Sequence, residues 1–109
     1  MQAPEKVEQI FTEGKIIVFS WGYEQTNIEF FKILKRQGEW VTIVEMGKID
    51  TYDAHSMTGT SMPTEVKPEA KPTRRKVHSY QGVERGVGYK TYGWGNLWDG
   101  TPAHYSSYA

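Results

Sequence analysis

Two neighbouring segments, residues 28–34 and 39–46, restrict the fold more than any other part of the chain. Both are rich in β-branched and aromatic side chains, which favour extended strands. The four residues between Lys35 and Trp40 include a glycine and suit a hairpin turn. A helix over residues 26–37 is the alternative, because a capping box begins it and Gly38 could end it. Apolar side chains occupy both faces of residues 28–34, so we favour two strands joined as a hairpin.

The rest of the chain supports a mainly β fold. With 109 residues, the length suits one domain. Eleven glycines and an aromatic content of 14% favour strands and tight turns. Further strands are predicted over residues 15–20, 75–80 and 87–92, and a short helix over residues 4–13. We therefore expect a small, strongly bent, SH3-like barrel of about five strands with a short N-terminal helix.

Residues 53–73 differ from their surroundings in composition. The first part is rich in Ser, Thr, Gly and Met, and the second part carries Pro68 and Pro72 among charged residues. Proline lacks the N–H that a central strand needs. We therefore predict a long, flexible loop, and long loops in small domains are either functional or disordered.

Charge and cysteine content exclude several classes of protein. The chain has no cysteine, which excludes disulfides and zinc sites of the cysteine type. It has no leader-like start and no apolar run of about 20 residues, so we expect a cytoplasmic protein without a membrane partner. Net charge is zero, but residues 1–65 carry a net −4 and residues 66–109 a net +4. The two halves can neutralise each other within the fold or present opposite faces to a partner.

The sequence Ser20-Trp21-Gly22-Tyr23-Glu24-Gln25-Thr26-Asn27 is the first candidate binding surface. It follows an apolar run, Ile16-Ile17-Val18-Phe19, that predicts a buried strand. Aromatic rings here could stack on a base or another flat ligand, while the polar side chains hydrogen-bond its edge. The alternative is a structural loop whose tryptophan belongs to the core. The candidate binding residues are Trp21, Tyr23, Glu24, Gln25 and Asn27.

A basic cluster beside the predicted loop is the second candidate. Lys71 precedes three consecutive basic residues, Arg74, Arg75 and Lys76, and these three are the predicted binding residues. Such a cluster could contact phosphate groups or an acidic protein surface. The alternative is a solvated loop edge without a partner.

Catalytic and metal-binding patterns are not recognisable. His55, His78 and His104 lack the spacing of metal ligands, and the glycines around Val87 lack the strand–turn–helix context of a phosphate-binding loop. We therefore expect no cofactor and no metal, and an enzyme is less expected than a binding protein. The segment Trp98-Asp99-Gly100 fits a turn in which the tryptophan packs, the aspartate caps and the glycine adopts positive φ.

Two stretches resemble a known group of proteins. Residues 20–31, which carry the motif Ser-Trp-Gly-Tyr-Glu-Gln-Thr-Asn, and the tail from Trp98-Asp99-Gly100 to Ala109 resemble an uncharacterised family of small bacteriophage and mobile-element proteins. The order of the intervening segments is also similar. The resemblance implies a phage or plasmid context and transfers no catalytic residue.

Together these observations predict a small non-enzymatic binding protein. The resemblance implies that its target is a host macromolecule, for example a component of host defence, in the bacterial cytoplasm. One alternative is a nucleic-acid-binding module that uses aromatic stacking and the basic cluster. Another is a binder of a nucleotide-like small molecule. The partner could thus be a host protein or a nucleic acid, and the oligomeric state is not predicted.

Overall fold

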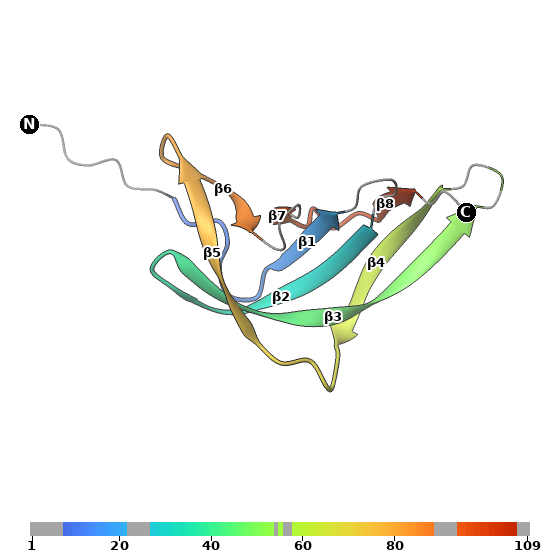
Figure 1. Ribbon diagram of the computed structural model, residues 1–109, viewed down its shortest axis with the longest axis horizontal. Helices are drawn as coiled ribbons and strands as arrows, with labels where there is room; N and C mark the ends of the chain where they lie inside the picture. Colours follow the sequence, from blue (N-terminus) through green and yellow to red (C-terminus); the bar gives the residue numbers. More distant parts are fainter. Residues whose placement is uncertain (1–7, 22–26, 54, 56–57, 89–93, 107–109) are drawn as a thin grey trace, which may run out of the picture.

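The computed structural model describes residues 8–21, 27–53, 55, 58–88 and 94–106. All regular elements in these ranges are β-strands (Figure 1). They are β1 (Ile16–Trp21), β2 (Asn27–Gln37), β3 (Trp40–Asp53), β4 (Thr58–Val66), β5 (Thr73–Tyr80), β6 (Val83–Gly88), β7 (Trp94–Leu97) and β8 (Ala103–Ser106). No helix that could span a membrane occurs in these ranges.

Six of the strands close into an antiparallel barrel. Their order is β2-β1-β7-β6-β5-β3, and β3 pairs with β2 to complete the ring. Closure pairs both edges of the sheet, which removes exposed strand edges from the barrel itself. The prediction of a mainly β fold with a small barrel is confirmed.

The hairpin predicted between residues 28 and 46 is confirmed. Strand β2 pairs with β3 from Phe31 opposite Glu45 to Gln37 opposite Trp40. Gly38 forms the turn with φ of +58°, a conformation that side-chain-bearing residues rarely adopt. The register shifts between Ile33 and Lys35, so Leu34 forms a bulge that bends the strand.

The barrel interior is filled by alternate residues of its strands, as the period of a β-strand requires. Phe19 and Phe31 meet edge to face with ring centroids 5.1 Å apart. Burying such aromatic rings supplies much of the volume in a small core. The buried cluster comprises Phe11, Ile17, Phe19, Phe31, Ile33, Val41, Ile43, Val77 and Val87.

A second layer lies outside the barrel. Strand β3 is 14 residues long, and its second half leaves the barrel to pair with β4, which in turn pairs with β8 (Figure 1). A second buried cluster contains Ile28, Phe30 and Met46, and the partly buried Trp98 packs against it. Phe30 and Phe31 therefore enter different cores, which explains why β2 is apolar on both faces.

The predicted N-terminal helix is wrong over residues 8–13. Glu8 forms a β-bridge with Val83, and Phe11 is buried in the barrel core. The backbone N–H groups of Ile10 and Phe11 donate to the Glu84 carboxylate at 2.8 and 3.2 Å. This long-range contact with a buried acid satisfies the backbone groups that a helix would otherwise have bonded locally.

The predicted loop over residues 53–73 is wrong in its central part, where β4 forms. Its proline, Pro63, lies opposite Lys48 beside a register shift, and β8 pairs only with residues 58–61 of β4. Neither neighbouring strand requires an N–H from Pro63, so the proline is tolerated there. Pro68 and Pro72 do lie outside the strands, in the connection between β4 and β5.

Candidate functional site

The registers of β2, β3 and β5 bring basic and aromatic side chains together on the outside of the barrel. One cross-strand row contains Lys35, Thr42 and Arg74, and the next contains Gln37, Trp40 and Lys76. The flanking residues Val41 and Ile43 point into the core. Because side chains alternate along a strand, both rows face outward.

Arg74 and Trp40 form the centre of this surface. The Arg74 guanidinium lies over the Trp40 ring, 5.2 Å from its centroid, in a cation–π contact. Trp40 nevertheless remains 42% exposed. An exposed tryptophan held in place by an arginine offers a stacking surface with a positive charge beside it.

The surface continues along β5. Arg74, Lys76, His78 and Tyr80 alternate with the half-buried Arg75, the buried Val77 and the exposed Ser79. All four are exposed, Tyr80 by 65%. At the usual rise per residue the stripe is about 20 Å long. The acidic neighbour of Lys76 is the exposed Glu39, 3.7 Å away, and such exposed ion pairs are weak. We call the set Lys35, Trp40, Arg74, Lys76, His78 and Tyr80 the basic–aromatic face.

The predicted basic cluster divides between the two sides of β5. Arg74 and Lys76 belong to the basic–aromatic face, whereas Arg75 lies opposite Val41 and is half-buried. The interpretation of the three residues as part of a loop is wrong, because they lie within strand β5 and pair with β3. Trp40 was not among the residues predicted from the sequence. The signal that points to it is an aromatic residue at the start of a predicted strand, here paired with Lys76 of β5.

The candidate motif around Trp21 lies elsewhere. Trp21 ends β1 and pairs with Asn27, the first residue of β2. Tyr23, Glu24 and Gln25 lie outside the described residues. Asn27 is eight residues from Lys35 along β2, roughly 25 Å at the usual rise. The described ends of the motif are therefore remote from the basic–aromatic face.

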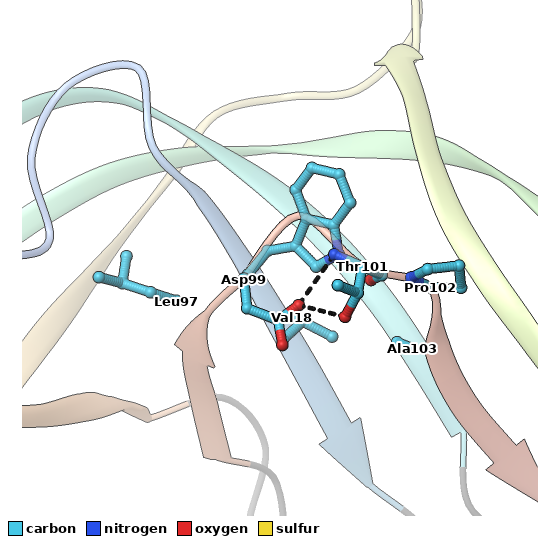
Figure 2. Close-up of a pocket in the computed structure, with 7 residues that line it drawn as sticks. Val18, Leu97, Asp99, Thr101, Pro102 and Ala103 are labelled. Carbon is cyan, nitrogen blue, oxygen red and sulfur yellow. Dashed lines mark hydrogen bonds between the residues drawn. The ribbon is translucent and has the colours of Figure 1, made fainter.

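A pocket of about 280 Å³ lies beside the turn that follows β7 (Figure 2). Its lining residues are Val18, Leu97, Trp98, Asp99, Thr101, Pro102 and Ala103. Asp99 accepts hydrogen bonds from the Thr101 N–H at 2.9 Å and the Thr101 hydroxyl at 2.6 Å. These bonds from Thr101 hold the pKa of Asp99 below its usual value. The carboxylate thus stabilises the turn.

Trp98 and Gly100 complete that turn as expected. The Trp98 indole N–H donates to the Thr101 carbonyl at 2.7 Å, and its ring meets Phe30 edge to face at 6.1 Å. Gly100 has φ of +89°. The prediction that Trp98 packs, that Asp99 caps the turn and that Gly100 adopts positive φ is confirmed. These three residues therefore belong to the scaffold.

One buried charge pair lies at the end of the barrel. Arg36 donates to both carboxylate oxygens of Glu84, at 3.0 and 2.6 Å, and also to the carbonyls of Phe11 and Gly38. Every one of these contacts ties protein segments together, so we assign the pair a structural role. No cluster of three or more metal-binding side chains occurs among the described residues.

Comparisons with protein-family models, with curated proteins and with solved structures find no match to this chain.

Proposed function

We propose that this protein is a non-enzymatic binding module that holds single-stranded nucleic acid on its basic–aromatic face. The observation that carries the proposal is the stacking of Arg74 on the exposed Trp40, in register with Lys35 and Lys76. The face lies on a closed barrel, so rigid strands hold its side chains in position.

The chemistry of the face suits a single strand better than a duplex. Lysine and arginine neutralise phosphates, while exposed aromatic rings stack with bases, and stacking tolerates any sequence. Bases are available for such stacking only when they are not already stacked in a helix. Trp40 and Tyr80 are both exposed and lie on the same outer surface as the cations. The arrangement supports binding without strong sequence preference.

The attraction is local, because the whole chain has no net charge. Lys35, Arg74 and Lys76 outnumber Glu39, the nearby acid that pairs with Lys76. Binding should therefore weaken as salt rises, with a slope set by the few phosphates contacted.

The host context implied by the resemblance to phage and mobile-element proteins belongs to the same proposal, as does a cytoplasmic location. The closed barrel is compatible with an SH3-like assignment. In this view the host macromolecule bound is a nucleic acid.

The test is fluorescence anisotropy with labelled single-stranded oligonucleotides of mixed sequence, titrated at several salt concentrations. Trp40→Ala should weaken binding by about 1–3 kcal/mol, the value of one stacked base. Arg74→Ala should weaken binding and reduce the salt slope by about 0.7, the contribution of one phosphate contact to a single strand. Lys15→Ala is the matched control, because Lys15 is exposed but lies outside the face.

Absence of binding at low salt would refute the proposal. Equal losses for Lys15→Ala and Arg74→Ala would also contradict it, since they would reveal a response to total charge alone. Tighter binding of a duplex than of its separate strands would indicate a purely electrostatic contact without base stacking.

A further inference from the structure

The second half of β3 has an open edge, residues 46–51. Beyond Glu45, β2 no longer pairs with β3, while β4 pairs with it from Met46 onward. Figure 1 shows this half of β3 at the outer border of the molecule. Among the described residues no strand pairs with β3 on the side that β2 has left.

Hydrogen bonds elsewhere fix which residues face this edge. In an antiparallel ladder, the backbone N–H and C=O of successive residues point to alternate sides. The backbone groups of Ile33 bond Gly14 and Lys15, on the side away from β3. The backbone groups of its neighbour Lys32 therefore point toward β3, where Lys32 pairs with Val44. Val44 therefore faces β2. Glu45 then faces the other side, as the hydrogen bond from the Lys67 N–H to its carbonyl at 3.1 Å requires.

Continuing the alternation, Met46, Lys48 and Asp50 direct their backbone groups to the open edge. An edge whose backbone groups bond no strand among the described residues is a template for another strand. An added antiparallel strand can form hydrogen-bonded pairs only with these residues. Their side chains lie on one face of the sheet, and Ile49, which is 63% exposed, lies on the other.

We propose that the occupant of this edge is a second copy of the same chain, paired antiparallel about a twofold axis at Ile49. Charge selects this register from three, whose twofold axes lie at Lys48, at Ile49 or at Asp50. Two of the three put either Lys48 opposite Lys48 or Asp50 opposite Asp50, and like charges directly opposite are destabilising. The third puts Lys48 opposite Asp50 twice.

Existing contacts are compatible with this pairing. Lys48 Nζ donates to the Ile28 carbonyl at 2.5 Å, which leaves two of its three N–H donors. Asp50 accepts from the Ser61 hydroxyl with one carboxylate oxygen, which leaves the other available. The dimer would join β4 and β8 of both copies into one continuous sheet.

A cysteine at position 49 tests the register, because the chain has no cysteine of its own. In this register Ile49 meets Ile49 of the partner in a non-hydrogen-bonded pair, with Cα atoms about 4.5 Å apart. That distance lies within the range of a disulfide. Under mild oxidation Ile49→Cys should form a covalent dimer, whereas Thr51→Cys, also exposed, should not. Equal or absent cross-linking of the two variants would overturn the proposal.

Charge variants test the selection of partners. Lys48→Asp and Asp50→Lys should each run as monomers in sedimentation velocity, because each repels its own copy. An equimolar mixture should recover the wild-type dimer, since every pair is then opposite in charge, and recovery also shows that both variants fold. Wild-type protein that stays monomeric at high concentration, or single variants that dimerise like wild type, would refute the inference.

Discussion

The buried pair of Arg36 and Glu84 provides the sharpest prediction about stability. Glu84 accepts four hydrogen bonds, two from Arg36 and one each from the N–H groups of Ile10 and Phe11. The side chains of Arg36 and Glu84 are only 10% and 1% exposed. Glu84→Gln removes the negative charge and leaves the arginine buried without a counter-ion.

Breaking one partner of a buried ion pair costs about 3–5 kcal/mol. The amide introduced by Glu84→Gln would keep one oxygen acceptor, so part of the hydrogen bonding survives and we expect a loss near the lower end, about 3 kcal/mol. That is a large fraction of the stability of a domain, which is about 5–15 kcal/mol. The N-terminal segment should become less ordered in the Glu84→Gln variant, because Glu84 accepts hydrogen bonds from the N–H groups of residues 10 and 11.

The contribution of the Arg36–Glu84 pair to the free energy of unfolding should depend on pH. Burial raises the pKa of Glu84, but hydrogen bonds from Arg36, Phe11 and Ile10, together with the Arg36 charge, outweigh it and hold the pKa below 4.5. A depressed folded-state pKa stabilises the protein above the unfolded value, and this contribution is lost as pH falls through the folded pKa. The difference between wild type and Glu84→Gln should therefore be constant near neutral pH and shrink in acid, as the pH falls through the unfolded-state pKa and then the lower folded-state pKa of Glu84.

Urea denaturation at several pH values measures both effects. The matched control is Glu45→Gln, which breaks the exposed pair of Glu45 with Lys67 and should cost at most about 1 kcal/mol. The double variant Arg36→Met/Glu84→Leu should recover only part of the loss, because an apolar pair can replace the buried charges but leaves the N–H groups of Ile10 and Phe11 without their acceptor. A cost for Glu84→Gln no greater than that of Glu45→Gln, or a difference that stays constant in acid, would refute the reasoning.

Two further substitutions test packing. Gly95→Ala should destabilise by about 1–3 kcal/mol through overpacking, because a Cβ there would lie 2.7 Å from Ile17 Cγ2 and collide with the Phe19 ring; Gly88→Ala, whose Cβ would have 3.6 Å to its nearest neighbour, is the control, and equal melting temperatures would contradict the prediction. Trp98→Ala should cost about 3 kcal/mol, because its ring packs on Phe30 and its N–H binds the turn; a variant that melts normally would show that the second core does not depend on this ring.

Features built from neighbouring residues could be predicted from the sequence. The β2–β3 hairpin follows from two β-rich segments around Gly38, and the turn after Trp98 follows from Asp99 and Gly100. The mainly β class follows from the same short-range preferences. Local rules suffice there because the interacting groups are only a few residues apart.

Features built from distant residues could not be predicted in this way. Residues 8–13 fit a helical pattern, but Glu84, more than seventy positions away, binds their backbone groups and overrides it. Strand β4 forms because β3 is long enough to pair with it beyond the barrel, although its own sequence resembles a loop.

The candidate site shows the same division. The sequence by itself determined that Arg74 and Lys76 are neighbours of like charge, and that Arg75 lies between them. Only the tertiary structure decided that Arg75 turns inward and that Arg74 stacks on Trp40. The physical reason is that the pairing of β3 with β5 fixes a register between residues more than thirty positions apart, which local preferences cannot set.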